Sequence, residues 1–147
     1  MTKNDPKMSK LKNRLLNHLK NELFCQIKQS PIHGVGVFAI RPIPKGIDPF
    51  RTLKKEREIK FHIDILDKLH PEVAKQMRRF CYYNDEFIYL SSMGLNQMNM
   101  IIYLNHSKSP NVKLQKMGGS VTLRKIKKGE ELTINYDNEF GDIHTFK

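Results

Sequence analysis

The segment Tyr-Leu-Asn-His-Ser-Lys-Ser-Pro-Asn, residues 103–111, follows an apolar run and precedes two short strand-like stretches. Its polar residues Asn105, His106 and Ser107 come directly after apolar ones. Asn and His at such a junction carry donors and acceptors that need partners when they are buried. Those partners can be loop backbone or a ligand. By itself the segment leaves both interpretations open and favours the structural one.

Two further stretches carry the same ambiguity. Residues 34–38, Gly-Val-Gly-Val-Phe, place a glycine pair at the start of a strand, where backbone can approach a ligand closely. No third glycine opens a helix, so the pair is not a dinucleotide-binding fingerprint. Residues 129–137, Gly-Glu-Glu-Leu-Thr-Ile-Asn-Tyr-Asp, read as a turn and a strand that ends in a tyrosine beside acidic residues. Each stretch also has a purely structural explanation.

Around these stretches the sequence predicts short strands and few helices. A basic amphipathic helix is expected over 11–24, with its apolar stripe packed on the domain. A role at a membrane surface, as a transit peptide or in nucleic-acid binding is the less favoured alternative, because Asp5 and Glu22 lie in the segment. Residues 52–80 are charged with apolar positions at helical spacing, which predicts helix interrupted at His70-Pro71. Strands are expected at 24–27, 36–40, 82–90, 112–116, 120–124 and 131–136. The fold class is therefore mainly β, a β-rich α+β fold with one helical insertion.

Length and composition limit the class of protein. The chain has 147 residues, which suits a single domain of globular composition. No apolar run reaches the roughly 18 residues of a membrane span, and the first residues lack the apolar stretch of a secretory signal, so we expect neither. The two cysteines, Cys25 and Cys81, are too few for a disulfide framework or a zinc site built from paired cysteines. We expect no metal.

The charge is strongly basic but unevenly distributed. Against 15 Asp and Glu stand 26 Lys and Arg, a formal net charge of +11, which raises contact with nucleic acid or another polyanion as the first hypothesis. Residues 81–104 contain no Lys or Arg, and residues 129–147 contain only Lys147. If these two acidic stretches meet in space they form a region that attracts a cation; otherwise they are ordinary solvated surface.

Taken together and in this order, the three stretches resemble the signatures of the SET-domain family of protein-lysine methyltransferases. A GxG-V-F-A signature corresponds to residues 34–39, an F/Y-x-N-H-S-x-x-P-N signature to 103–111, and a G-E-E-L-T-x-x-Y signature to 129–136. The combination is specific although each piece is not. The resemblance spans residues 24–140 and is strongest to the minimal SET proteins of bacteria and large viruses.

The resemblance implies a fold of several small curved sheets with a pseudoknot. In it, the segment around Asn105 and the strand ending at Tyr136 thread past each other, which is rare among proteins. S-adenosylmethionine (AdoMet) would bind as cofactor on one face, and a substrate lysine would enter a narrow channel from the other. Residues 1–23 would form a basic arm, 24–140 the SET domain and 141–147 a short tail.

The resemblance also assigns roles to individual residues. Tyr136 would be the catalytic residue. Cofactor binding would fall to Gly34, Val35, Gly36, Val37, Asn105 and His106, and the substrate channel would be lined by Tyr89, Ile134 and Phe140. Ile134 stands two residues before the tyrosine, where relatives carry an aromatic residue whose hydroxyl, when present, limits methylation to the first group. Since isoleucine has no hydroxyl, we expect di- or trimethylation to be permitted.

The expected partner is a protein with an accessible lysine, such as a histone or another basic protein. The basic surface could also contact nucleic acid, a homodimer is open, and no membrane contact is expected. The expected location is inside the cell, in the cytoplasm or the nucleus. The alternative from another class is a SET scaffold without catalysis that binds nucleic acid or chromatin through its basic N-terminal half. Salt-dependent DNA affinity without AdoMet binding would favour this alternative.

Overall fold

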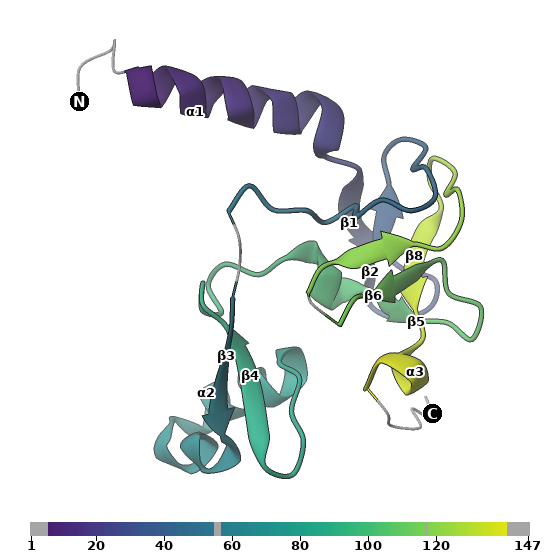
Figure 1. Ribbon diagram of the computed structural model, residues 1–147. Helices are drawn as coiled ribbons and strands as arrows, with labels where there is room; N and C mark the ends of the chain where they lie inside the picture. The colour runs from purple at the N-terminus through teal and green to yellow at the C-terminus, as the bar shows by residue number, and fades with distance from the viewer. Residues whose placement is uncertain (1–5, 55–56, 117, 141–147) are drawn as a thin grey trace. The chain divides into compact units, whose positions relative to one another are not determined.

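The computed structural model describes residues 6–54, 57–116 and 118–140 (Figure 1). The chain divides into two compact units. The first combines residues up to Leu53 with those from Tyr103 onward, and the second comprises Lys54–Ile102. The fold class predicted from the sequence, a β-rich α+β fold of several small sheets with a helical insertion, is confirmed.

The first unit is built on a four-stranded sheet in the order β1-β2-β8-β5. Strands β1 (Cys25–Gln29) and β2 (Val35–Ala39) form an antiparallel hairpin, and β8 (Glu131–Ile134) pairs antiparallel with β2. The two-residue strand β5 (Asn105–His106) lies parallel to β8. The sheet therefore joins the early and late parts of the chain through neighbours that are distant in sequence.

A second small hairpin and an isolated bridge complete this unit. Strands β6 (Val112–Leu114) and β7 (Ser120–Thr122) pair antiparallel, close to the predicted positions. Ile43 bridges to Ile126. Fully buried aliphatic side chains make the core, which includes Val37, Ile43, Leu104, Val112, Ile126 and Leu132. These residues come from both the strands and the loops of the unit, so burying them together stabilises the packing of the loops on the sheet.

The N-terminal helix was predicted correctly in character but not in packing. Helix α1 (Pro6–Asn17) begins at a proline, whose missing N–H costs nothing in the first turn, and continues into one π-helical turn, η1 (His18–Glu22). The prediction that its apolar stripe packs on the domain is wrong, because α1 contains no buried residue and its leucines are exposed. The helix is amphipathic, yet no described residue buries its apolar face.

The second unit holds a two-stranded sheet, β3 (Glu58–His62) with β4 (Phe87–Ser91), and helix α2 (Pro71–Phe80). A 3-10 helix, η2 (Ile63–Lys68), precedes α2, and another, η3 (Met100–Tyr103), ends the unit. Leu66, Met77 and Ile88 form its small core. Helix α2 starts as predicted: Pro71 opens it, and the His70 side chain accepts a hydrogen bond from the Glu72 N–H at 3.3 Å.

The helix expected over 52–80 is wrong at its beginning, where the structure has strand β3. Ile59 and Phe61 alternate with polar residues, a period of two that suits a strand. Five register pairs with β4 then supply partners for its backbone, from Glu58 opposite Ser91 to His62 opposite Phe87. Pairing with a distant segment decided the outcome, as it often does for short strands.

Candidate functional site

The segment 103–111 and the strand of the G-E-E-L-T stretch lie side by side, as the pseudoknot requires. Asn105 is opposite Thr133 and His106 opposite Ile134 in the parallel pairing of β5 with β8. The Ser107 N–H continues the ladder by donating to the Ile134 carbonyl at 2.9 Å. Two of the three stretches singled out in the sequence therefore meet through main-chain hydrogen bonds.

The Asn105 side chain brings in the third stretch. Its amide nitrogen is 3.2 Å from the His33 carbonyl oxygen and 3.1 Å from that of Val35, and both carbonyls are acceptors. Asn105 itself is buried. A buried amide needs its hydrogen bonds, so this contact holds the turn before β2 against β5. All three stretches converge on Asn105.

Ser30 and Glu131 complete an oxygen-rich cluster around the same amide. The Asn105 amide nitrogen lies 2.8 Å from Glu131 Oε1 and 3.0 Å from Ser30 Oγ. The Ser30 hydroxyl lies 2.8 Å from Glu131 Oε1, to which it donates, and accepts from the Ile32 N–H at 2.9 Å. We name Ser30, Asn105 and Glu131, with the carbonyls of His33 and Val35, the oxygen cluster. Its one carboxylate and several carbonyl oxygens form a local environment that favours a cation.

Sequence reasoning missed Ser30 and Glu131 as members of the site. Glu131 is part of the quoted 129–137 stretch, but it was considered only as local acidic charge. Ser30 opens a Ser-Pro turn with no distinctive signature of its own. The sequence signal that could have identified Glu131 is its position at the start of a predicted strand. A residue there lies at the end of a sheet, beside the loops of the neighbouring strands.

Gly36 is glycine because Glu131 occupies the space a side chain would need. A Cβ atom at this position would lie 2.1 Å from Glu131 Oε1 and 3.0 Å from the Asn105 amide nitrogen. Such distances are well inside van der Waals contact, so a side chain here would displace the carboxylate. Gly34 serves a different purpose: its φ of +49° turns the chain into β2. The sequence predicted that the backbone at this glycine pair approaches a ligand closely. In the structure, the group next to Gly36 is the Glu131 carboxylate.

Tyr136 lies against the same segment. Its hydroxyl donates to the carbonyl of Leu104, and its backbone N–H donates to Nδ1 of His106 at 3.1 Å. The two rings meet edge to face with centroids 5.5 Å apart. Burial raises the pKa of the Tyr136 phenol above its ordinary value. The phenol is therefore protonated at neutral pH and acts as a hydrogen-bond donor.

The predicted strand 131–136 is too long by two residues, because a helix begins at Tyr136. Strand β8 ends at Ile134, and α3 spans Tyr136–Phe140. The Asn135 side chain accepts hydrogen bonds from the backbone N–H groups of Asp137, at 3.0 Å, and Asn138, at 3.3 Å. This is the bonding of a helix N-cap, and asparagine is among the best residues for it. The tyrosine thus stands at the junction of strand and helix.

The Asn111 side chain is hydrogen-bonded to the backbone of β8. Its side-chain oxygen accepts from the Thr133 N–H at 2.8 Å, and its amide donates to the Glu131 carbonyl, also at 2.8 Å. The side chain is only 2% exposed and imitates a neighbouring strand. Asn111 is the last residue of the 103–111 signature, but it was assigned no role from the sequence.

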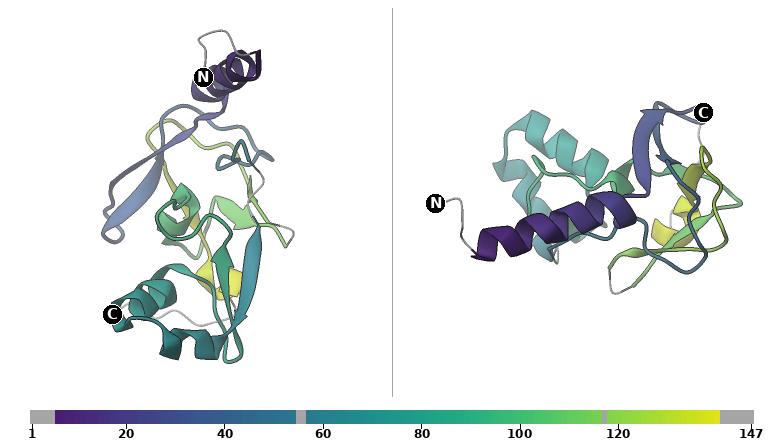
Figure 2. Two further views of the ribbon diagram at one scale, coloured as in Figure 1. Left: turned by 90° about the vertical axis from the view of Figure 1, so that its left-hand side faces the viewer. Right: turned by 90° about the horizontal axis from the view of Figure 1, so that it is seen from above.

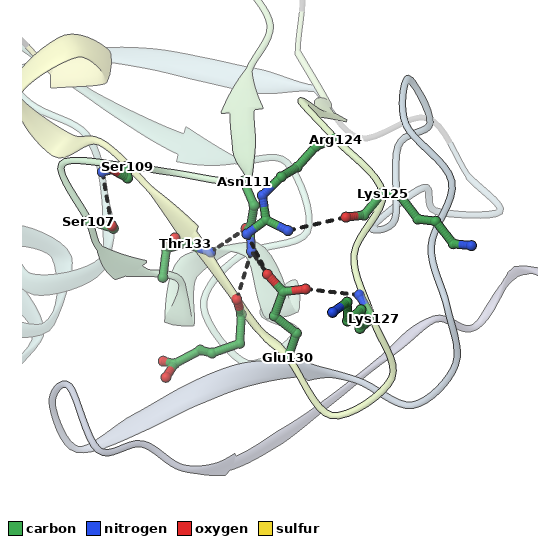
Figure 3. Close-up of polar contacts among 9 residues, drawn as sticks. Ser107, Ser109, Asn111, Arg124, Lys125, Lys127, Glu130 and Thr133 are labelled. Atoms are coloured by element: carbon green, nitrogen blue, oxygen red, sulfur yellow. Dashed lines mark hydrogen bonds and ion pairs between the residues drawn. The ribbon is translucent and has the colours of Figure 1, made fainter.

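A surface ion pair supports this arrangement (Figure 3). Arg124 is hydrogen-bonded and ion-paired to Glu130, and the Lys127 N–H donates to the same carboxylate at 2.9 Å. The Asn111 amide lies 3.4 Å from Glu130 Oε1. The Arg124 guanidinium holds the pKa of the Glu130 carboxyl below its ordinary value. The Arg124–Glu130 ion pair therefore stabilises the turn that precedes β8, and Glu130 links this turn to Asn111 by a hydrogen bond.

The remaining predicted site residues are placed as follows. Val37 is fully buried in β2, and Val35 is exposed at its start. Ile134 is buried at the end of β8. Tyr89 belongs to the second unit, where its ring lies 5.5 Å from that of Tyr82. Phe140 ends α3, and its side chain is outside the described part of the structure, as are all of residues 141–147.

The described residues show neither a metal centre nor a membrane span. Among them, no group of three or more His, Cys, Asp or Glu is placed to hold a metal ion. No helix within 6–54, 57–116 and 118–140 combines the length and apolar character needed to cross a bilayer. Cys25 and Cys81 are both free thiols, and burial raises the pKa of Cys25 to about 12.

Comparison with known proteins identifies a family for most of these features. The SET domain family model matches residues 50–137, more than half of the chain, and includes the 103–111 and 129–136 stretches but not 34–39. No curated protein matches the chain in sequence.

Two solved structures are similar in fold. One is a proposed histone methyltransferase of Plasmodium falciparum, with a TM-score of 0.50 and 17% identity over 81% of this chain and 97% of that chain. The other is a humanized mutant of the Chaetomium thermophilum Polycomb Repressive Complex 2 bound to an inhibitor. Its TM-score is 0.47 and its identity 20%, over 81% of this chain and 15% of that chain.

Proposed function

This chain belongs to the SET-domain family, and from that premise we propose that it is an AdoMet-dependent protein-lysine N-methyltransferase that acts on a basic protein such as a histone. One observation carries the proposal. The Tyr136 hydroxyl is bonded to the carbonyl of Leu104, and the next residue, Asn105, reaches the His33 and Val35 carbonyls. A scaffold without catalysis has no need to gather these groups at one place.

The oxygen cluster fits the cationic cofactor. AdoMet carries an ammonium and a sulfonium group, and the carbonyls of His33 and Val35 with the Glu131 carboxylate offer acceptors and negative charge. On the family's pattern, the backbone of residues 34–37 would hold the methionine part, while Asn105 and His106 would hold the adenosyl and ammonium end. When bound, AdoMet supplies the methyl group, whose bond to sulfur breaks as its bond to the neutral lysine nitrogen forms.

Tyr136 orients the amine in this proposal and does not remove its proton. The phenol is protonated because burial raises its pKa, and it already donates its hydrogen to Leu104. A phenol oxygen that donates its hydrogen can also accept a hydrogen bond, and in this proposal it accepts from a lysine N–H. A lysine has an ordinary pKa near 10.4, and desolvation beside a positive charge lowers that pKa, so the amine can lose its proton to water before transfer. Alignment then supplies most of the rate.

Acidic residues around Tyr136 support a basic protein as substrate. Asp137 and Glu139 follow it in α3, while Glu130 directly precedes β8 and Glu131 is the first residue of β8. Glu130 pairs with Arg124, but the local sequence between Gly129 and Phe140 contains no Lys or Arg. Opposite charge steers encounter between proteins and increases the association rate. A lysine-rich tail is the substrate chemistry that this end of the molecule would attract.

Di- or trimethylation is proposed from Ile134. This side chain is buried at the end of β8, two residues before Tyr136, and it carries no hydroxyl that could hold a water molecule beside the amine. Mass spectrometry of a histone substrate at saturating AdoMet is expected to show di- or trimethylated lysine. Monomethyl product alone would contradict this part of the proposal.

The test is transfer of labelled methyl groups from AdoMet to core histones and to a total cell lysate, with wild type and Tyr136→Phe compared. Labelled protein with wild type, and a large loss with the variant, would support both activity and residue. If wild type labels nothing, fails to bind AdoMet and instead binds DNA in a salt-dependent way, the chain is a non-catalytic binding module.

A further inference from the structure

A stripe of leucines on the N-terminal helix has no cover among the described residues. Leu11, Leu15, Leu16 and Leu19 are 46%, 41%, 49% and 55% exposed, and neither α1 nor η1 contains a buried residue. In Figure 1 and in the right-hand view of Figure 2, α1 extends away from the sheet of its own unit. Large apolar side chains gathered on one exposed face usually mark an interaction surface.

The helix is hydrogen-bonded to the rest of its unit through Arg14 and through its π-helical turn. The Arg14 guanidinium donates to the Leu53 carbonyl at 2.7 Å, and the Arg41 guanidinium donates to the Lys20 carbonyl of η1 at 2.5 Å. These contacts anchor the C-terminal part of the helix and leave the leucine face uncovered. The leucines are therefore exposed although the helix is hydrogen-bonded to its unit.

The rest of the helix surface is basic. Residues 6–22 carry five basic side chains, Lys7, Lys10, Lys12, Arg14 and Lys20, and one acidic side chain, Glu22, which lies 3.4 Å from His18 at the end of η1. The remaining polar positions are uncharged or histidine. An apolar stripe beside a predominantly basic polar face is the composition of helices that lie in the plane of an anionic membrane surface.

We propose that α1 and η1 bind the surface of a bilayer containing anionic lipids, with the leucines inserted at the boundary between headgroups and acyl chains. Charge complementarity selects this occupant over a second copy of the chain, because two such helices would repel each other. It also fits better than nucleic acid, because phosphate contacts use the basic residues but leave the leucines exposed to water.

Lys12 distinguishes a bilayer from a protein groove. Met8, Lys12 and Leu16 are spaced four residues apart, so Lys12 lies within the apolar face, next to the row formed by Leu11 and Leu15. In a closed apolar groove of a protein, the Lys12 ammonium would lose its hydrating water, which costs free energy. At a membrane surface a lysine extends its apolar stem along the acyl chains and keeps its charge among the headgroups. The one charged residue within the stripe is thus accommodated by lipid.

The test is co-sedimentation of the full chain with vesicles of phosphatidylcholine, with or without phosphatidylserine. We expect binding to vesicles that contain phosphatidylserine, weakening as salt is raised, and much weaker binding to phosphatidylcholine alone. The double variant Leu11→Gln, Leu15→Gln keeps the charge and the helix propensity, and it is expected to bind roughly tenfold more weakly or worse. Lys10→Gln with Lys12→Gln is expected to weaken binding by a similar factor.

The matched control is Asn13→Gln, at an exposed polar position of the same helix, which is expected to bind like wild type. Because α1 buries no residue, all variants are expected to retain the wild-type melting temperature. The proposal is overturned if wild type does not bind anionic vesicles at low salt, or if the leucine variant binds them as wild type does. Binding to duplex DNA that depends on the lysines and not on the leucines, without vesicle binding, would assign the helix to nucleic acid instead.

Discussion

The backbone N–H of Tyr136 donates a hydrogen bond to Nδ1 of His106, 3.1 Å away and thirty residues earlier in the chain. This bond joins the first residue of α3 to the last residue of β5. It also requires that Nδ1 of His106 be an acceptor, so a neutral ring carries its proton on Nε2. The position of the phenol therefore depends on the imidazole as well as on Leu104.

Replacing His106 with alanine removes this acceptor and the ring that contacts Tyr136. We expect a loss of about 1 kcal/mol in the free energy of unfolding, the usual net value of one hydrogen bond. Methyl transfer is expected to fall further than stability does, because the phenol is no longer held in one place. Urea denaturation and initial rates check the two effects. Lys108→Ala, at an exposed position of the same segment, serves as the control, and equal losses in both variants would refute the assignment.

Replacing Asn111 with alanine leaves the Thr133 N–H and the Glu131 carbonyl without their side-chain partner. Since Asn111 is 2% exposed, water cannot replace both bonds easily, and we expect a loss of about 2–4 kcal/mol in the free energy of unfolding. Urea denaturation measures it. Ser109→Ala, on the exposed part of the loop, is expected to be within about 0.5 kcal/mol of wild type. An Asn111→Ala chain as stable as that control would contradict the role given to this side chain.

Gly36→Ala tests the close approach of Glu131. A methyl group here would lie 2.1 Å from Oε1, so we expect a loss of about 1–3 kcal/mol from crowding. In a Glu131→Ala background the same substitution is expected to cost much less, which a double-mutant cycle in denaturant would reveal. Gly46→Ala is the control. Its φ of +83° makes alanine unfavourable, but no atom lies within 4 Å of its Cβ position, so its cost is expected not to depend on Glu131.

The Arg124–Glu130 pair gives the protein an acid-sensitive contribution to stability. The folded state lowers the pKa of Glu130 below its ordinary value of 4.5, chiefly through the Arg124 hydrogen bond. A group with a lowered folded pKa stabilises the protein above its unfolded pKa, and this contribution is lost as pH falls through the folded value. We expect Glu130→Gln to be less stable than wild type at neutral pH and the gap to close below pH 4.5. A gap that is the same at both pH values would contradict the charge-based account.

The sequence was sufficient to predict the fold class and the convergence of the three stretches. Each stretch carries a family signature, and the resemblance implies where each signature lies in the fold. It was insufficient where the outcome depended on partners distant in sequence. Strand β3 formed because β4 was available to pair with it, and local charge had suggested helix. The exposure of the α1 leucines depends on how the helix is placed against the rest of its unit, and the spacing of apolar residues in the sequence does not determine that placement.

Within the site, the residues to which the sequence assigned roles lie in the three signatures, but two signature residues, Asn111 and Glu131, received no such role, and Ser30 lies outside the signatures. Ser30, Glu131 and Asn111 act through side-chain bonds to backbone and to Asn105, and such contacts are visible only once the strands are paired. The helix start at Tyr136 is an exception, since Asn135 is a good N-cap residue directly before it. That local signal was present in the sequence and was overlooked beside the strand pattern.

The most direct measurement of the central claim is a calorimetric titration of AdoMet into three forms of the chain. Wild type is expected to bind with measurable heat. Tyr136→Phe should bind with nearly the same affinity while transferring no methyl group to histone, because the hydroxyl is proposed to position the amine and not the cofactor. Asn105→Ala should bind at least about tenfold more weakly, since it removes the amide at the centre of the oxygen cluster. No heat with wild type, or full methyl transfer by Tyr136→Phe, would contradict the account.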